Sequence, residues 1–229
     1  MAICQYLHSM VSWKPRPFIF IHIPKCAGTS IEKTLLPIVA GYPDFEYMPD
    51  EDRQKYWLPG RSNRQHAKLR QIAEHFSLDG FFKFAIARNP WDRAVSQIEY
   101  LSRIRATSLF SKPTFKEKLR VYCQSKSTIW GHDLGACQWD YLTLAERDPA
   151  IEYIGRFESL DADFKKICGL IGIDPQPNLL HVFKSNRAKH YSVYYDEESA
   201  EWVRKRFARD IDYFGYQFEK AASISPLTE

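Results

Sequence analysis

The chain contains few residues that could cross-link it or bind a metal. Its 229 residues include five cysteines, which stand at positions 4, 26, 123, 137 and 168. Their number is odd and they lack close metal-ligand spacing, so a disulfide framework and a zinc site are both poor explanations. We therefore expect a protein of a reducing compartment that holds no metal.

A long apolar run is also missing. The first 17 residues contain no continuous apolar stretch, and the run from Phe18 to Ile23 is too short to anchor or span a membrane. Internal repeats, low-complexity tracts and Gly/Ser-rich linkers are absent from the sequence. The sequence thus predicts a cytoplasmic protein without a membrane partner. It predicts a single domain over residues 1–229, with a core at about 17–218 and a flexible tail at 219–229.

Neither basic nor acidic residues are in large excess. The formal net charge is +4, from 32 basic and 28 acidic residues. A mild positive charge suits an anionic ligand, whereas a nucleic-acid-binding protein usually carries a stronger and more concentrated basic face. We expect an anionic small molecule, and no nucleic acid, as a partner.

The most informative segment that is present is a strand, a short loop and a helix near the N-terminus. Residues 18–23 read as a buried strand, and residues 29–36 read as a helix that ends at Pro37. Thr29 and Glu32 have the spacing of a capping box. The pattern predicts that a helix N-terminus directly follows a strand and a short loop.

The loop between this strand and this helix has the parts of a phosphate cradle. Backbone N–H groups and the helix dipole would point at an anion, the hydroxyls of Thr29 and Ser30 would add donors, and Lys25 would supply charge. The loop is not a Walker sequence, because Lys25 precedes Gly28 instead of following a second glycine. It predicts binding of a phosphorylated nucleotide.

A second cationic position follows the next predicted strand. Residues 81–87 read as a strand, and Arg88 comes at its carboxyl end, where parallel strands deliver residues to a ligand crevice. The next two residues, an asparagine and a proline, suit the start of a helix that runs to about Arg105. Ser96 lies on the face of that helix opposite its apolar stripe. Arg88 and Ser96 together predict a second anion site.

Strands and helices alternate along the rest of the chain. We expect helices at 63–76, 136–147, 158–171 and 197–208, a weaker helix at 114–124, and a strand at 151–155. Such alternation indicates a mostly parallel sheet with helices on both faces. The predicted fold class is α/β, as a P-loop-like three-layer domain with a central mostly parallel sheet flanked by helices.

Taken in order, these motifs resemble those of the sulfotransferases that use 3′-phosphoadenosine 5′-phosphosulfate (PAPS). The branch in question includes carbohydrate and heparan sulfate 2-O-sulfotransferases and many bacterial relatives. Residues 20–30 resemble the loop that binds the 5′-phosphosulfate, and residues 88–96 resemble the motif for the 3′-phosphate. The later segments that also resemble the family are 154–158, 194–198 and 212–216.

The resemblance implies a reaction and a set of residues. A sulfuryl group would pass from PAPS to a hydroxyl, or an amine, of a carbohydrate or small-molecule acceptor, leaving adenosine 3′,5′-bisphosphate and using no metal. Lys25 would neutralise charge on the leaving oxygen. The donor-binding residues would be Pro24, Lys25, Cys26, Ala27, Gly28, Thr29, Ser30, Arg88 and Ser96, with Ser185 and Arg187 from a basic loop. Cys26 departs from the family, which usually has threonine there.

The acceptor hydroxyl needs a base, and His66 is the candidate. It lies in the first turn of the helix expected at 63–76, where the helix dipole disfavours the imidazolium form. In the related sequences a histidine before the arginine-bearing strand is the presumed base, and His66 is the residue found there. His22, on a core strand, is interpreted as a packing residue.

Two other functions stay open. A P-loop kinase could use the same cradle for ATP, but it would need a Mg²⁺-holding acid at a strand end, where this chain has Arg88. A non-catalytic nucleotide-binding module would bind the donor without turnover. No motif in the middle of the chain points to one acceptor or to an oligomeric state.

Overall fold

The computed structural model describes residues 16–39, 66–74, 77–104, 114–124, 128–129, 132–133, 136–145, 149–174, 176–182 and 190–220. The chain divides into two compact units. The first, here called the sheet unit, consists of residues 1–88 and 127–184. The second, here called the helical unit, consists of residues 89–126 and 185–229.

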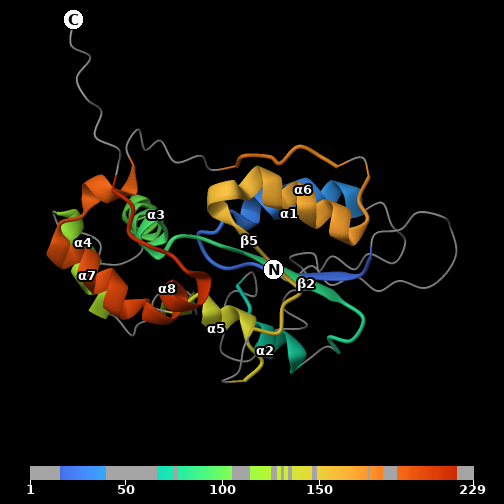
Figure 1. Ribbon diagram of the computed structural model, residues 1–229, viewed down its shortest axis with the longest axis horizontal. Helices are drawn as coiled ribbons and strands as arrows, with labels where there is room; N and C mark the ends of the chain where they lie inside the picture. The colour runs from blue at the N-terminus through green and yellow to red at the C-terminus, as the bar shows by residue number, and fades with distance from the viewer. Residues whose placement is uncertain are drawn as a thin grey trace, which may run out of the picture. The chain divides into compact units, whose positions relative to one another are not determined.

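Three parallel strands form the centre of the sheet unit (Figure 1). They are β1 (Phe18–Ile21), β2 (Phe82–Ala87) and β5 (Tyr153–Arg156), in the order β1-β2-β5. The register pairs Ile21 with Ala85 and Ala87 with Arg156. Because the strands are parallel, the loop after β1 and the residue after β2 leave the sheet at the same edge.

Aromatic packing buries β1 and β2. All four residues of β1 are buried, as is usual for a parallel sheet that is covered on both faces. The Phe20 and Phe84 rings stack with their centroids 5.1 Å apart, and the Phe18 ring centroid lies 5.7 Å from that of Phe84. Burial of each ring contributes on the order of 2–3 kcal/mol. These contacts hold the two strands whose ends carry the predicted site.

Helices flank this sheet on both faces. Helices α1 (Gly28–Val39) and α6 (Leu160–Ile171) lie on one side, and α2 (Leu69–Ala73) and α5 (Trp139–Leu142) lie on the other (Figure 1). The 3₁₀ helix η3 (Phe157–Ser159) leads from β5 into α6, and β3 (Thr128–Ile129) pairs antiparallel with β4 (His132–Asp133). The predicted α/β class, with a parallel sheet and flanking helices, is confirmed.

In its described part the helical unit contains α3 (Pro90–Arg103), α4 (Phe115–Gln124), η4 (Tyr191–Tyr194), α7 (Glu197–Arg206) and α8 (Ala208–Phe214). Asn89 caps α3 by accepting a hydrogen bond from Trp91 N–H at 3.1 Å, and Pro90 takes the first helical position, as predicted. The buried Trp91 ring donates its Nε1–H to the Ala200 carbonyl at 2.9 Å. This bond ties α3 to α7.

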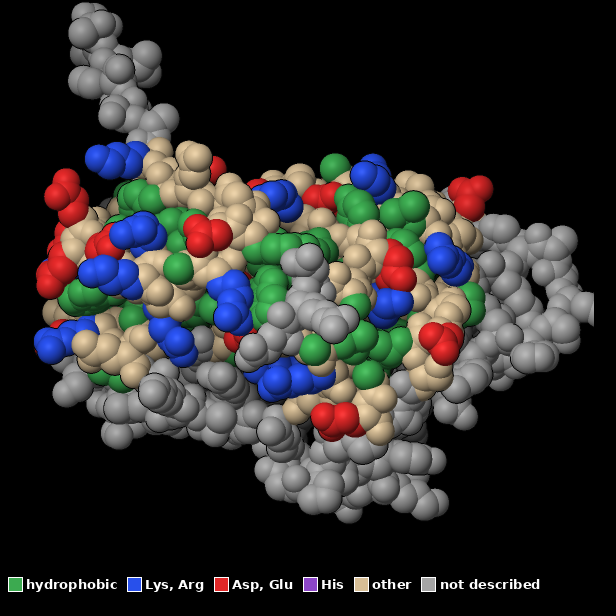
Figure 2. All heavy atoms as spheres, turned by 60° about the horizontal axis from the view of Figure 1, so that its bottom comes forward, with side chains coloured by type: hydrophobic (Ala, Val, Ile, Leu, Met, Phe, Trp, Pro, Cys, Tyr) green, Lys and Arg blue, Asp and Glu red, His purple; other side chains and the backbone are tan. Residues whose placement is uncertain are grey.

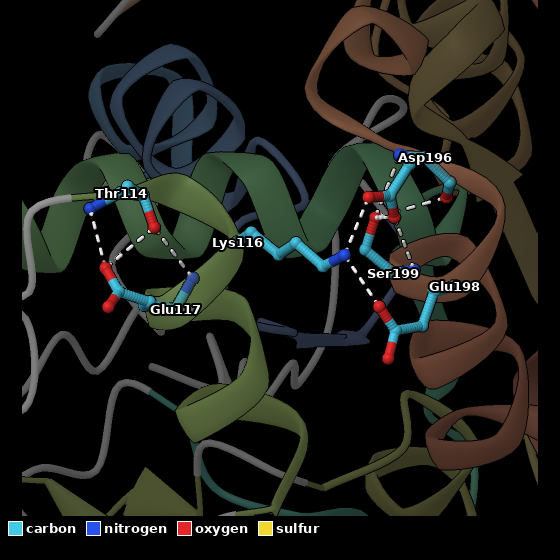
Figure 3. A network of polar contacts seen from close by, with 6 residues as sticks. All are labelled: Thr114, Lys116, Glu117, Asp196, Glu198 and Ser199. Atoms are coloured by element: carbon cyan, nitrogen blue, oxygen red, sulfur yellow. Dashed lines mark hydrogen bonds and ion pairs between the residues drawn. The ribbon is translucent and has the colours of Figure 1, made fainter.

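Figure 3 shows how charged groups join α4 to the start of α7. The Lys116 ammonium lies 2.7 Å from Asp196 Oδ2 and 2.6 Å from Glu198 Oε2. Asp196 also caps α7, because its Oδ1 accepts a hydrogen bond from Ser199 N–H at 2.8 Å. Hydrogen bonds from Lys116 and Ser199 hold the pKa of Asp196 well below its usual range. The cap of α7 and its contact with α4 therefore depend on one carboxylate.

Both predicted ends of the first helix are wrong. Helix α1 begins at Gly28, so Thr29 is inside its first turn and is not its cap. It continues through Pro37 to Val39. The proline is exposed and only two residues follow it in the helix, so the loss of its bond to the Lys33 carbonyl occurs near the end of α1.

Three other predicted helices are shorter than expected. Helix α2 starts only after Lys68, whose N–H donates to the side chain of Gln71 at 3.0 Å. The helix expected at 136–147 reduces to α5, since Thr143 is extended and ends it. The helix expected at 197–208 ends at Arg206 as α7, because the backbone at Phe207 has φ −114° and ψ 29°. Helix α8, which runs on to Phe214, was not predicted.

Lysine, arginine, aspartate and glutamate side chains lie interspersed on the face that Figure 2 shows. Within the described ranges, no helix is long and apolar enough to cross a membrane, and no group of three potential metal ligands is present.

Cys26, Cys123, Cys137 and Cys168 are free thiols. Burial raises the pKa of Cys168 to about 11, which makes this thiol unreactive at neutral pH.

Candidate active site

The loop between β1 and α1 (residues 22–27, the β1–α1 loop) has an unusual backbone. Lys25 and Ala27 both adopt positive φ, at 66° and 63°. Residues with a Cβ rarely adopt this region, at a cost on the order of 1–2 kcal/mol each. Left-handed residues turn nearby backbone N–H groups toward a common concavity, as in anion-binding nests. The strained loop therefore has a geometry that suits an anion.

The N-terminus of α1 follows this loop directly. Ser30 N–H and Ile31 N–H both donate to the Ala27 carbonyl, at 2.9 and 3.2 Å. The first-turn amides of Gly28 and Thr29 are among those that an α-helix leaves without an intrahelical acceptor, and the helix dipole adds partial positive charge there. This end of α1 thus has the backbone geometry that the sequence predicted for a phosphate site.

Gly28 leaves room for the ring of His22. A Cβ at position 28 would lie 1.9 Å from His22 Cδ2 and 2.1 Å from His22 Nε2. Glycine is therefore required here by the close approach of a side chain. The His22 side chain is 4% exposed, which agrees with its interpretation as a packing residue.

His22 is paired with Glu32 of α1. Its Nδ1 lies 2.9 Å from Glu32 Oε1, so the Nδ1–H donates to the carboxylate. Burial lowers the pKa of His22 to about 4 and outweighs the opposing effect of Glu32. Burial acts to raise the pKa of Glu32, but the hydrogen bond from His22 and nearby positive charge together outweigh it, and the net change in the pKa is downward. At neutral pH the pair is a neutral imidazole and a carboxylate.

His66 lies beside this pair. Its ring meets the His22 ring edge-on, with the centroids 4.4 Å apart. Its Nδ1 lies 2.8 Å from the His22 carbonyl oxygen. Because a carbonyl oxygen can only accept, Nδ1 of His66 carries a proton, and the neutral ring keeps its lone pair on Nε2. The prediction that a helix dipole tunes His66 is wrong, since α2 begins only at Leu69.

Arg88 connects the end of β2 to the β1–α1 loop. Its side chain is buried, its guanidinium lies over the Phe157 ring at 3.8 Å from the centroid, and its Nη1 donates to the Lys25 carbonyl at 2.9 Å. Stacking on an aromatic ring fixes the plane of a guanidinium. The arginine and the lysine that the sequence assigned to separate anion sites are therefore in direct contact within the sheet unit.

Comparison with known proteins identifies the family. The sequence profile of the sulfotransferase family matches residues 8–217, which include both strand ends and His66. The chain belongs to the sulfotransferase family. The match agrees with the family that the sequence motifs resembled.

Two curated relatives are similar to this sulfotransferase-family chain at low identity. Carbohydrate sulfotransferase 10 of Pongo abelii and carbohydrate sulfotransferase 10 of Homo sapiens are each 23% identical to it over 233 residues. The aligned segment covers 87% of this chain, and the chain spans 64% of the length of each relative.

The hydroxyl of Ser30 is hydrogen-bonded to the backbone of the segment 176–182. Ser30 Oγ accepts from Val182 N–H at 3.1 Å, and Thr34 Oγ1, one turn along α1, accepts from Leu180 N–H at 2.9 Å. The two hydroxyls hold the segment 176–182 against α1. The Ser30 hydroxyl is therefore bonded within the protein, as is its backbone N–H, which donates to the Ala27 carbonyl.

The other predicted residues of the site belong to the helical unit or fall outside the described residues. Ser96 is partly exposed on α3 of the helical unit. Arg93, on the same helix, is buried with its guanidinium 5.8 Å from the Phe207 ring centroid, so it is not a surface arginine. Ser185 and Arg187 lie outside the residues that the structure describes.

Sequence reasoning missed Gln138, which is fully buried beside the β1–α1 loop. It is a single polar residue in a mixed segment, and no pattern marks it. The ring of Phe157 under Arg88 was also missed, although it lies in the segment 154–158 that resembled the family and could have been found there.

Proposed function

We propose that this protein transfers a sulfuryl group from PAPS to a hydroxyl of a carbohydrate or small-molecule acceptor. Family membership over residues 8–217 supports sulfuryl transfer, and the names of the two relatives support a carbohydrate acceptor. The observation that carries the proposal is the β1–α1 loop, where left-handed backbone at Lys25 and Ala27 precedes the N-terminus of α1.

In this proposal the donor is held by its two charged ends. Residues 24–30 bind the 5′-phosphosulfate in a P-loop-like manner, through the first amides of α1 and the Lys25 ammonium. Arg88 binds the 3′-phosphate, the group to which the sequence motifs also assign Ser96, Ser185 and Arg187. Stacking on Phe157 supports this role, because it leaves the arginine preorganised for a phosphate.

The transfer step resembles phosphoryl transfer in its loose, in-line transition state. The acceptor oxygen forms a bond to sulfur while the bond between sulfur and the bridging oxygen breaks. The electron pair of that bond stays on the phosphate, which leaves as adenosine 3′,5′-bisphosphate. Lys25 stabilises the charge that develops on this leaving oxygen, and a fixed cation contributes most where charge appears only in the transition state.

The acceptor proton passes to His66 Nε2. The hydrogen bond from His66 Nδ1–H to the His22 carbonyl supports this assignment, because it leaves Nε2 unprotonated in the neutral ring. His22 and Glu32 then position the base. Glu32 holds the ring of His22, and the backbone carbonyl of His22 orients the ring of His66.

Transfer of radiolabelled sulfate from PAPS across a panel of carbohydrate acceptors tests the proposal. Lys25→Ala should lower kcat about 10²- to 10³-fold, and His66→Ala should lower it about 10²-fold or more. The matched controls are Lys33→Ala, at an exposed position of α1, and His181→Ala, whose side chain is 41% exposed. Both variants should retain wild-type turnover. Full turnover in the Lys25 variant would refute its assigned role.

A further inference from the structure

Gln138 makes several buried hydrogen bonds at the edge of the sheet. Its side chain is 0% exposed. Its Oε1 accepts from Arg88 N–H at 2.8 Å and from the Cys26 thiol at 3.2 Å. Its Nε2 donates to the Arg88 carbonyl at 2.8 Å. One buried carboxamide is therefore bonded to both the end of β2 and the β1–α1 loop.

The two bonds to Arg88 continue the sheet. The ladder between β1 and β2 stops at the pair Ile21–Ala85, because the chain leaves β1 to form the β1–α1 loop. Buried backbone groups beyond that pair need other partners. Gln138 bonds to the N–H and the carbonyl of one residue, as a neighbouring strand would, and so acts as a short substitute for β1.

The bond to Cys26 reaches the strained part of the loop. Cys26 is 1% exposed and lies between Lys25 and Ala27, the two residues with positive φ. Such backbone persists only where surrounding contacts over-determine it. Two such contacts are the Cys26–Gln138 bond and the bond from Arg88 Nη1 to the Lys25 carbonyl, which hold adjacent loop residues to the end of β2.

We propose that Gln138 is a positioning residue that holds the β1–α1 loop in its anion-binding conformation. It does so by linking Cys26 to the backbone of Arg88. The nature of the bound nucleotide rests on the proposed function, but the link itself does not. The side chain acts through the loop, because the bonds described above go to Arg88 and Cys26.

Gln138→Met tests the link, since methionine has a similar length but neither the donor nor the acceptor. Two measurements are made: the rate at which a thiol reagent labels Cys26, followed by mass spectrometry, and the Kd of adenosine 3′,5′-bisphosphate. Labelling should become at least about tenfold faster, and binding should weaken about 10- to 100-fold, as expected when a binding loop shifts by a fraction of an ångström. The labelling rate reports how often the buried Cys26 thiol becomes accessible once its bond to Gln138 is lost.

Leu142→Ala is the control for lost stability. Leu142 is buried at the end of α5, the helix that directly follows Gln138, and its side chain offers no hydrogen bond to lose. This variant should melt at a lower temperature while Cys26 labelling, compared well below both melting temperatures, stays slow. Equal labelling rates in Gln138→Met and Leu142→Ala would overturn the proposal.

A shape-matched pair at position 26 gives an independent answer. Cys26→Thr restores a donor to Gln138 Oε1, whereas Cys26→Val has the same shape and none. The threonine variant should bind adenosine 3′,5′-bisphosphate about tenfold more tightly than the valine variant does. Equal affinities of the two would also overturn the link. Absence of nucleotide binding by the wild type would refute the proposed function alone, because labelling still decides the link.

Discussion

At the scale of single residues, Gly28 is the position most sensitive to a small change. A Cβ there would overlap the His22 ring at 1.9 Å, and that ring is fixed by Glu32. Gly28→Ala should therefore destabilise the fold by about 2 kcal/mol or more in urea unfolding and should weaken nucleotide binding.

The clash can be isolated by removing its other partner. In a double-mutant cycle, His22→Ala should relieve most of the penalty of Gly28→Ala, because the ring that blocks the Cβ is gone. Gly169→Ala on α6 is the control: its Cβ would meet only the end of the Gln176 side chain at 3.3 Å, so it should be neutral or slightly stabilising. Additive effects of Gly28→Ala and His22→Ala would contradict the steric explanation.

His22 also predicts how stability depends on pH. The unfolded chain binds a proton at this histidine near its ordinary pKa of 6.5, whereas the folded chain stays neutral there until about pH 4. The contribution of His22 is thus fully present above pH 6.5 and is lost as the pH falls toward 4, by on the order of 3 kcal/mol. The lowered pKa of Glu32 acts in the same direction at still lower pH.

Urea unfolding at pH 7 and pH 5 measures this effect. His22→Asn keeps a donor for Glu32 but does not titrate, so its stability should change less between the two pH values. The same substitution at the exposed His181 serves as the control and should keep the wild-type pH dependence. A pH dependence of His22→Asn as steep as that of the wild type would show that other groups cause it.

The sequence revealed the residue types of the candidate site better than their contacts. Lys25, Gly28 and Arg88 were predicted from residue type and from their places after two strands, and those places are confirmed. The contact of Gln138 with Arg88 joins residues 50 apart in the chain and depends on where β1 ends. Local patterns carry no information on such a contact, so the residue was missed.

At the scale of elements, the start of α7 depends on Asp196. This carboxylate accepts from Ser199 N–H and pairs with Lys116 (Figure 3). Asp196→Ala removes both interactions and should lower the Tm by about 2–4 °C, as loss of a helix cap does in a chain of this size. Asp196→Asn keeps an acceptor for the cap and should lower the Tm less.

Salt separates the cap from the ion pair. Lys116 and Asp196 are well exposed, so 1 M NaCl should screen their attraction and bring Asp196→Asn close to the wild type in a thermal melt. The difference between the Asn and Ala variants should remain, because a cap hydrogen bond is local. If the Asn and Ala variants melt together at both salt concentrations, Asp196 does not act as a cap.

Elements were predicted well where local signals were strong and poorly where tertiary packing decides. Asn89 and Pro90 marked the start of α3 correctly. Pro37 was expected to end α1, but the helix continues two residues further to Val39. The short helices α2 and α5 lie on the sheet unit, and their ends are set by Lys68 with Gln71 and by the extended Thr143.

At the scale of the whole molecule, the sequence predicted an α/β class and a family, and both are confirmed. Alternation of strands and helices indicated a parallel sheet, and ordered motifs over most of the chain indicated the family. The acceptor could not be predicted in this way, because acceptor recognition does not follow from the donor motifs. It is the donor, therefore, on which the proposed function can be tested first.

Isothermal titration calorimetry with three nucleotides is the most direct test, because it needs no knowledge of the acceptor. Wild-type protein should bind adenosine 3′,5′-bisphosphate at least about tenfold more tightly than AMP, which lacks the 3′-phosphate, and more tightly than Mg·ATP. Equal affinity for AMP would contradict a 3′-phosphate site, and preference for Mg·ATP would contradict the sulfotransferase donor and favour a kinase.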